Sequence, residues 1–306
     1  MIAAANPGRR PTFAAVLGVK DEVEILEDCI AHLRAIGVGH IFAHDAGSSD
    51  GSERILRAHE GADFSVIEHS DMDPDAQAWN RLHADLARDS GADWVLYLDA
   101  DEFWLPRGGH LANCRALAEA DIVTVPRYNV ALGPSGPRIE GARTPYLGGD
   151  MQLVVNAPAR FRAALEEDPS LAWIRGVPVP KVIARPAAIG GVKDGDHDVV
   201  PPPGATARRA VADDMVIAHL PFSTLARFAR KIDNVRRVFD VHDEYFGAQL
   251  AWHWRRWLAL EGDEAIAAEF DRQVFDESAL ATLRASGHVR SRDELIAAAV
   301  AARHVG

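Results

Sequence analysis

WVLYLDADEFW, residues 94–104, is apolar through its first five residues and then places three acids within four positions. The apolar half has the composition of a buried strand. Asp99, Asp101 and Glu102 follow it directly, and burial of these charges without partners would be costly. The sequence therefore predicts that a ligand or nearby cations compensate the acids, and the identity of that compensating group largely determines the function.

Three segments that precede residue 92 also have the apolar composition of strands. Each is followed by a segment whose apolar residues have the spacing of a helix. The predicted strands are residues 12–19, 39–47, 62–70 and 92–101. The predicted helices are residues 21–37, 52–59 and 75–91. This alternation predicts an α/β fold with a mostly parallel sheet and crossover helices.

The rest of the chain changes character after Trp104. A further strand is predicted at 120–130, and residues 131–204 are rich in Gly and Pro, with short strands at 151–155 and 181–186. We expect an irregular, partly antiparallel region that covers the site. From Ser223 onward the spacing predicts helices to the end. The predicted organisation is a domain of residues 11–220, divided at 105/106, and a helical extension of residues 221–306.

Polar clusters follow three of the predicted strands, at residues 20–22, 45–51 and 99–102. Parallel strands bring their carboxyl ends to one edge, where ligands bind in such sheets. Asp99 and Asp101 are two residues apart, so in an extended segment they point to the same side. Carboxylates suit a hard cation such as Mg²⁺ or Mn²⁺. The alternative is a solvated acidic loop, with Glu102 at a helix start.

These clusters together resemble the family 2-type glycosyltransferases with the GT-A fold, in the branch that carries three particular motifs. Here the motifs are KDE at 20–22, DAGSSDGS at 45–52 and WVLYLDADEF at 94–103. The likeness covers about the first 105 residues. It returns in KVIARP at 181–186 and in HLPFSTLARFARKI at 219–232.

The resemblance implies an enzyme of cell-surface polysaccharide synthesis that transfers a sugar from a nucleotide-sugar, most often a UDP-sugar. The bulk properties described below predict that it is cytoplasmic. The acceptor would be a saccharide or a glycolipid, and the transfer would invert by direct displacement. In this assignment Lys20, Glu22 and Asp45 hold the base and ribose. Asp99 reaches the ribose or the sugar, and Asp101 binds Mn²⁺ or Mg²⁺ at the diphosphate.

Two further residues are candidates for the donor site. Asn80 corresponds to an Asn in the family's A-x-N segment; otherwise it is a polar residue on a helix face. Lys181 is placed to neutralise phosphate or acceptor charge; otherwise it lies on the solvent face of a strand.

The metal site needs a third ligand, which in this family often comes from a distant His. His197, in a polar loop after the strand at 181–186, is the preferred candidate, and His219 is the second. His219 could instead line the acceptor site or the phosphates. The general base is predicted to be Asp150 rather than the acids at 166–168, which have the pattern of an exposed helix end.

Bulk properties narrow the class of protein. The net charge of −12 argues against non-specific binding to nucleic acid. With only Cys29 and Cys114, no disulfide framework is expected, and a reducing compartment is the simpler interpretation. We find no signal-peptide pattern and no run long enough to span a bilayer.

The C-terminal helices carry basic residues beside tryptophans. This composition leaves open a peripheral contact with the inner face of the membrane. Packing on the sheet, with the arginines paired to surplus acids, is the favoured interpretation. The oligomeric state is not predicted.

Two other functions share some of these features. One is an inactive relative that only binds nucleotide or saccharide. The other is a haloacid-dehalogenase-like phosphatase, which also places D-x-D at a strand end. Phe103 stands where those enzymes usually carry Thr or Val, and the motif comes late in the chain. Both features disfavour the phosphatase.

Overall fold

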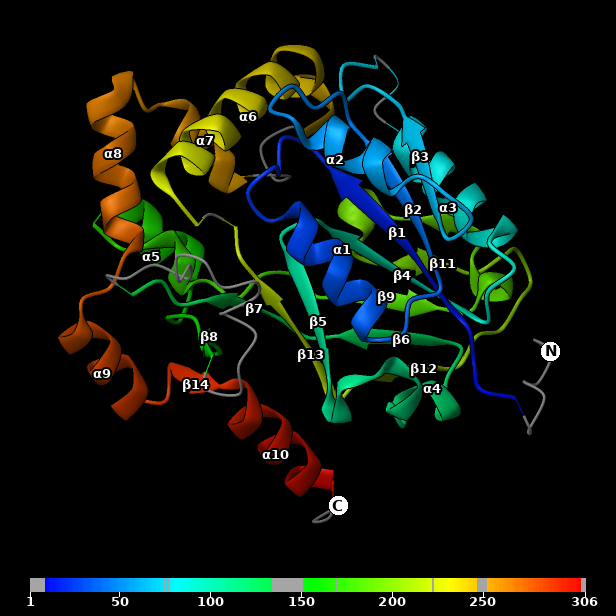
Figure 1. Cartoon of the computed structure of the whole chain (residues 1–306). Helices are drawn as coiled ribbons and strands as arrows, with labels where there is room; N and C mark the ends of the chain where they lie inside the picture. The colour runs from blue at the N-terminus through cyan, green and yellow to red at the C-terminus, as the bar shows by residue number, and fades with distance from the viewer. Residues whose placement is uncertain are drawn as a thin grey trace.

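A mostly parallel sheet of seven strands, in the order β12-β6-β9-β4-β1-β2-β3, forms the centre of the computed structural model (Figure 1). β9 runs antiparallel to β4 and β6, and the other pairs are parallel. In chain order the strands are β1 (Phe13–Val19), β2 (His40–Asp45), β3 (Phe64–Glu68), β4 (Trp94–Asp99), β6 (Ile122–Val125), β9 (Lys181–Ala184) and β12 (Arg209–Val211). The structure describes residues 9–73, 75, 77–133, 151–168, 170–221, 223–246 and 252–303.

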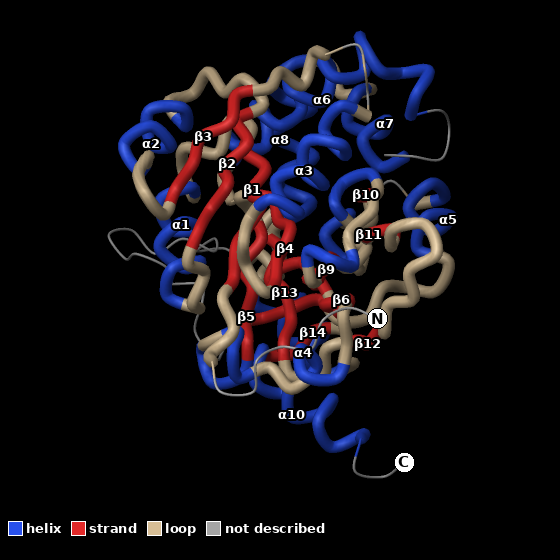
Figure 2. The backbone as a smooth tube through the Cα atoms, turned by 90° about the vertical axis from the view of Figure 1, so that its right-hand side faces the viewer, coloured by secondary structure: helices blue, strands red, loops and turns tan. Residues whose placement is uncertain are grey.

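Helices cover both faces of this sheet (Figure 2). They are α1 (Leu26–Ala35), α2 (Ser52–His59), α3 (Ala78–Asp89) and the short α4 (Ala116–Glu119). β1 shows why both faces must be covered. Ala15 and Leu17 belong to the same hydrophobic cluster as α1, whereas Ala14 and Val16 pack with α3. Because side chains alternate along a strand, an apolar run such as β1 requires a layer on each side.

A second sheet, of order β14-β8-β7-β13-β5, continues from the first. Its strands are β5 (Glu102–Pro106), β7 (Arg127–Val130), β8 (Gln152–Val154), β13 (Met215–His219) and β14 (Val289–Ser291). β5 starts three residues after β4 ends, so the turn at Asp101 passes the chain from one sheet to the other. A small hairpin of β10 (Gly191–Val192) and β11 (Val199–Val200) stands apart from both sheets.

The later helices share a core with the irregular middle of the chain. They are α5 (Phe161–Glu167), α6 (Leu225–Phe246), α7 (Trp252–Leu258), α8 (Gly262–Gln273), α9 (Glu277–Ala285) and α10 (Arg292–Arg303). Trp257 is buried against Trp173 and Phe228, with ring centroids 5.3 and 5.4 Å apart. Trp252 and Trp254 pack on the same cluster. The tryptophans of α7 therefore contribute to the core.

The predicted α/β class, mostly parallel sheet and helical C-terminal region are confirmed. The acids at 166–168 lie at the exposed end of α5, as expected. The sequence missed β5, which continues directly from the acidic turn, and β14, a strand within the region predicted to be wholly helical. Among the described helices, none combines the length and apolar composition needed to cross a bilayer.

Leu96 lies in the middle of β4, fully buried between β1 and β9. We predict that Leu96→Ala lowers the free energy of unfolding by about 3 kcal/mol, because it leaves a cavity in a tightly packed layer. Urea denaturation followed by tryptophan fluorescence measures this. The control is Val179→Ala, at a side chain that is 58% exposed, where a change below about 0.5 kcal/mol is expected. Equal losses at the two positions would contradict the assignment of β4 to the core.

Candidate active site at the sheet edge

The three polar clusters meet at one edge of the central sheet, where β1, β2 and β4 end. The strand register pairs Gly18 with Asp99 and Val19 with Asp45. β9 runs the other way and therefore begins at this edge, which brings Lys181 there. The placement of the clusters on one edge, predicted from the alternation of strands and helices, is confirmed.

A row of polar residues crosses the second sheet at its junction with this edge. The register sets His219 of β13 opposite Glu102 of β5 on one side and opposite Asn129 of β7 on the other. Asp101 immediately precedes β5. Ligand atoms of Asp101, Glu102 and His219 consequently lie within 4.8 Å of one another, and all three residues are buried. This is the arrangement that could hold a divalent cation.

The hydrogen bonds of Asn129 determine the tautomer of His219. The Asn129 amide nitrogen donates to the carbonyl oxygens of Ile174 and Gly176, at 3.2 and 2.9 Å. Asn129 Oδ1 therefore faces His219 Nδ1, at 2.7 Å, and accepts its proton. Burial lowers the pKa of His219 well below its ordinary value. The ring is thus neutral, and its lone pair is on Nε2.

The Nε2 lone pair points toward Asp101. His219 Nε2 lies 3.7 Å from Asp101 Oδ1, and neither atom makes a hydrogen bond within the described part of the chain. Two electron-rich atoms at this distance repel each other unless a cation lies between them. Carboxylate oxygen and neutral imidazole nitrogen are both ordinary metal ligands. The residues present fit a divalent cation at this position.

The other oxygen of Asp101 is held by two cations from α6. Lys231 Nζ lies 2.8 Å and Arg227 Nη2 lies 3.1 Å from Asp101 Oδ2. Burial alone would raise the pKa of Asp101, but the charges of Lys231 and Arg227 hold that pKa far below its ordinary value. Asp101 is therefore ionised at any physiological pH.

Glu102 and Asp99 are compensated by a second group of cations. Arg127 Nη1 hydrogen-bonds Glu102 Oε1, and Lys181 Nζ lies 3.5 Å from Glu102 Oε2. Lys181 Nζ also lies 3.1 Å from Asp99 Oδ2. Burial raises the pKa of Glu102 to about 7, although Lys181 and Arg127 oppose the shift. Asp99 is half exposed, at 52%, so it is the acid of the turn that faces outward.

Residues of the first two clusters form hydrogen bonds and ion pairs with neighbouring segments of the edge. Lys20 Nζ donates to the carbonyl oxygens of Ala46 and Gly47, at 3.0 and 2.9 Å. Glu22 forms a two-point ion pair with Arg227, with Nη2 2.8 Å from Oε1. Asp45 is buried, and its carboxylate accepts the backbone N–H of Ser48 at 2.8 Å. The carboxylates of Glu22 and Asp45 are therefore paired with groups of the protein itself.

The loop that contains His197 lies against the same edge. Asn80 Nδ2 donates to Asp194 Oδ1 at 2.6 Å, and the carbonyl oxygen of Gly195 accepts from Lys181 Nζ at 2.8 Å. His197 Nδ1 is 3.1 Å from the carbonyl oxygen of Pro180. Burial lowers the pKa of His197 to about 4, and the charges of Lys181 and Arg127 add to this effect. His197 lies outside the group formed by Asp101, Glu102 and His219.

A buried pair of histidines anchors this loop. His44 Nδ1 lies 2.8 Å from His83 Nε2, and the outer nitrogens face acceptors: His44 Nε2 faces the His69 carbonyl oxygen at 3.0 Å. His83 Nδ1 lies 2.9 Å from Asp196 Oδ2. These contacts join the His69 backbone, the two rings and Asp196 in one buried chain, which holds the loop against β2 and α3.

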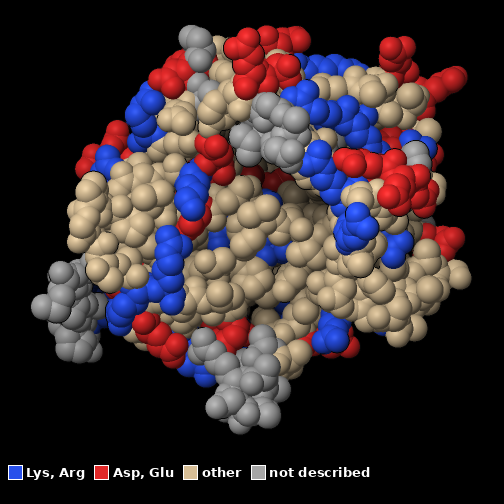
Figure 3. All heavy atoms as spheres, turned by 180° about the vertical axis from the view of Figure 1, so that it is seen from behind, with Lys and Arg blue, Asp and Glu red and all other residues tan. Residues whose placement is uncertain are grey.

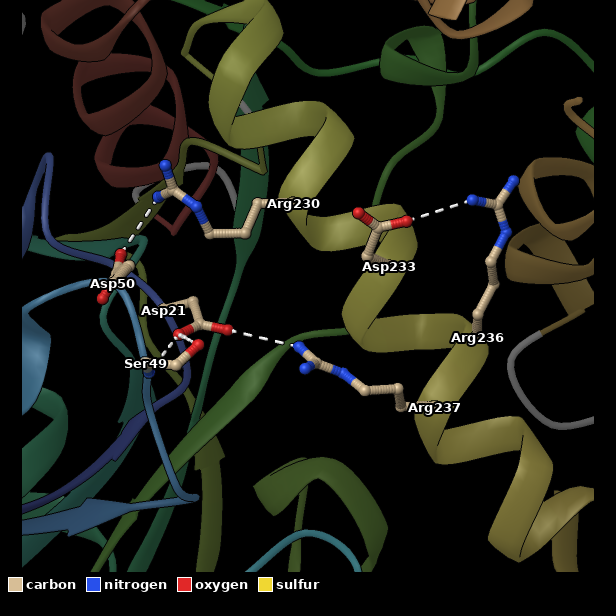
Figure 4. A pocket seen from close by; sticks show the side chains of 7 residues that line it. All are labelled: Asp21, Ser49, Asp50, Arg230, Asp233, Arg236 and Arg237. Carbon is tan, nitrogen blue, oxygen red and sulfur yellow. Dashed lines mark hydrogen bonds and ion pairs between the residues drawn. The ribbon is translucent and has the colours of Figure 1, made fainter. Parts of the chain in front are cut away.

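A cavity of about 550 Å³ lies between α6 and the first two clusters. The residues that line it are Asp21, Ser49, Asp50, Arg230, Asp233, Arg236 and Arg237 (Figure 4). Arg230 Nη1 lies 3.0 Å from Asp50 Oδ2, and Arg237 Nη2 lies 3.6 Å from Asp21 Oδ2. Together with Arg227 and Lys231, these pairs show that the cations of α6 neutralise acids of all three clusters. The pairing of helix arginines with acids, expected from the composition, is confirmed.

The face seen in Figure 3, which lies behind the view of Figure 1, also carries both basic and acidic side chains. In Figure 3, basic and acidic side chains lie interspersed around a largely uncharged central area. This is the pattern expected when arginines pair with surplus acids.

The structure brings Asp99, Asp101, Lys181 and His219 together, and places Lys20, Glu22 and Asp45 at the adjoining strand ends. Asn80 contacts the His197 loop. Asp150 lies outside the described residues. Sequence reasoning missed Arg127, Asn129, Arg227 and Lys231 as parts of the site. The helical basic pattern of 227–237 was visible, but nothing in it indicated which acids it would meet.

No protein-family model and no curated protein sequence matches the chain. Solved structures similar to it include TarS from S. aureus in complex with UDP, at 14% identity and a TM-score of 0.38, covering 81% of this chain and 70% of that one. A mannosyltransferase from Pyrobaculum calidifontis in complex with GDP-Man and Mn²⁺ has 17% identity and a TM-score of 0.37, covering 100% and 84%. Glucosyl-3-phosphoglycerate synthase from Mycobacterium tuberculosis, in complex with Mn²⁺, UDP and glucosyl-3-phosphoglycerate, has 15% identity and a TM-score of 0.34, covering 76% and 80%. Identities and scores this low do not establish a family for the chain.

The buried histidine pair makes stability depend on pH. Burial, with His83 beside it, lowers the pKa of His44 from 6.5 to about 4. As the pH falls, the unfolded chain takes up this proton near 6.5, whereas the folded chain does not until about 4. Folding stability is therefore lost over that range. We predict that His44→Gln reduces the loss of unfolding free energy between pH 7 and pH 5 by about 2 kcal/mol, measured by urea denaturation at both pH values. An unchanged loss would show that His44 is not the group responsible.

Proposed function

We propose that the chain is a metal-dependent glycosyltransferase that moves a sugar from a nucleotide-sugar, with UDP-sugars as the first donor class to test. The acceptor is proposed to be a saccharide or a glycolipid, and the transfer to invert by direct displacement. One observation carries this proposal. Asp101 Oδ1 and His219 Nε2 face each other without a proton between them, at the carboxyl edge of a parallel sheet and beside a cluster of cations.

The proposed donor lies along the strand ends. The base and ribose are proposed to lie between the first two clusters, beside Lys20, Glu22 and Asp45. The cavity against α6 is lined by other residues of the same clusters, Asp21, Ser49 and Asp50. Asp99 is exposed next to the buried acids, which suits a contact with the ribose or the transferred sugar. Lys181, which is buried and held by Asp99 and Glu102, is proposed to neutralise phosphate charge through its positive charge. Asn80 is proposed to support this edge through the His197 loop.

Asp101 and His219 are the proposed ligands of Mn²⁺ or Mg²⁺, with Glu102 beside them. A divalent cation there would stabilise the negative charge that develops on the leaving diphosphate. Asn129 acts on His219 from behind, by keeping the Nε2 lone pair directed inward. His197 remains a candidate for a further ligand.

The acceptor hydroxyl must lose its proton to a base. Asp150 remains the proposed base. Asp150→Asn should lower the rate of transfer about 100-fold or more and leave the affinity for the donor nucleotide nearly unchanged. A parallel loss of nucleotide affinity would assign Asp150 to the donor site instead.

The proposal is tested first by nucleotide binding. We predict that Mn²⁺ raises the affinity for UDP in the unmodified chain and that Asp101→Ala abolishes this increase, because the variant loses one cation ligand. Thermal-shift titrations of UDP, with and without Mn²⁺, measure both effects. Asp263→Ala, at an exposed acid in the first turn of α8, serves as the control and should bind as the unmodified chain does.

Turnover then separates an enzyme from a binding protein. Release of UDP from a panel of UDP-sugars, in the presence of saccharide acceptors, would establish transfer. Metal-dependent nucleotide binding without release from any donor would favour an inactive relative. If UDP and other nucleotides bind no better with metal, the glycosyltransferase proposal is wrong.

A further inference from the structure

Asp101 divides its two oxygens between different tasks. Oδ1 faces His219, whereas Oδ2 accepts both Arg227 and Lys231. The carboxylate that would bind a divalent cation is thus already engaged in two ion pairs. Any cation that binds at Oδ1 must compete with the positive charges held at Oδ2.

The charges around this carboxylate balance as a set. The acids are Glu22, Asp99, Asp101 and Glu102, and the cations are Arg127, Lys181, Arg227 and Lys231. When Glu102 is ionised the cluster is neutral. A divalent cation that arrives alone adds two positive charges to a buried region, where Coulomb repulsion is strong. A nucleotide diphosphate that arrives with the cation restores neutrality.

The two α6 cations differ in how firmly they are held. Arg227 is 1% exposed, forms two hydrogen bonds to Glu22, and donates to the Leu220 carbonyl oxygen at 2.7 Å. Lys231 is 26% exposed, and apart from Asp101 it contacts only the Pro221 carbonyl oxygen, at 3.1 Å, among the described residues. A lysine ammonium on a four-carbon stem can change partners by rotating its side chain, whereas a forked guanidinium cannot.

We propose that Lys231 is an exchangeable counter-ion of Asp101. It neutralises Asp101 until a divalent cation and a diphosphate bind together, and it then moves from Asp101 to a phosphate oxygen. This proposal rests on the proposed function. Its consequence is that metal and nucleotide each bind weakly alone and strengthen one another, by the same factor in both directions.

The exchange makes an unusual prediction for Lys231→Met. Removal of the lysine should strengthen the binding of Mn²⁺ alone by about tenfold, because a competing positive charge is gone. The same change should weaken UDP in the presence of Mn²⁺ by about tenfold, because a phosphate contact is lost. The factor by which Mn²⁺ and UDP strengthen one another should therefore fall.

The experiment measures free Mn²⁺ by electron paramagnetic resonance while the full chain is titrated, with and without UDP. Lys231→Arg keeps the charge and should bind Mn²⁺ alone as weakly as the unmodified chain. Lys193→Met is the matched control, since Lys193 is exposed and, among the residues that the structure describes, pairs only with Asp198 on the surface. It should change neither affinity. Thermal denaturation of each variant confirms that it is folded.

The affinity for Mn²⁺ in the absence of UDP, compared between Lys231→Met and the unmodified chain, tests the proposed exchange of Lys231. Unchanged or weaker Mn²⁺ binding by a folded Lys231→Met variant overturns it, because a residue with a merely structural role could not strengthen the site. The UDP affinity of the unmodified chain decides the proposed function. If that chain binds no UDP while Lys231→Met still strengthens Mn²⁺ binding, the transferase proposal fails and Lys231 remains the counter-ion of a cation site.

Discussion

The buried charge of Asp101 is the constraint on which the rest of the edge depends. A carboxylate in this position is tolerated only if cations and hydrogen-bond donors surround it. Lys231 and Arg227 supply this compensation, and Arg227 is itself held by Glu22 from the end of β1. One guanidinium thus joins the end of β1, the turn after β4 and the start of α6. The position of α6 over the sheet edge follows from this contact as much as from its apolar face.

The pairing of acids with cations along this edge restricts which ligands can bind there. Each of four acids along the edge forms an ion pair with an arginine or a lysine: Asp50, Glu22, Asp101 and Asp99. Such a network is rigid when complete and unfavourable when one member is removed. A substrate that carries both a cation and a diphosphate can replace members of the network without leaving any charge unpaired. A neutral ligand could not, which is one physical reason to favour a nucleotide-sugar with its metal.

The sequence predicted the fold of residues 11–105 well because this part of the chain is built from local patterns. The apolar runs of β1 and β4 and the spacing of Leu26, Ile30 and Leu33 in α1 are each visible within a short window. The convergence of the acids followed from the rule for parallel strands. The resemblance to a known family supplied the roles of individual residues, which no periodicity could give.

The remainder of the site depends on contacts between distant segments. Asn129 and Glu102 reach His219 through the register of β7, β13 and β5, and register is not encoded in the composition of any one strand. Arg227 is likewise 205 residues from Glu22. Lys181 was recognisable as a candidate, but its complete burial was not, because β9 is covered by segments that come both before and after it.

The pairing of β14 with β8 also bears on how the chain acquires its structure. β2 pairs with β1 and β3, the strands on either side of it in the sequence, and such contacts form quickly. The second sheet is instead complete only when β14 pairs with β8, which brings Val289 opposite Val154. During synthesis the ends of β1, β2 and β4 can therefore come together on the ribosome while the strand that completes the second sheet has not yet been made. The row from Asn129 to Glu102 does not depend on β14, since it lies on β7, β13 and β5, and the residues of the site that are made last are Arg227 and Lys231 on α6.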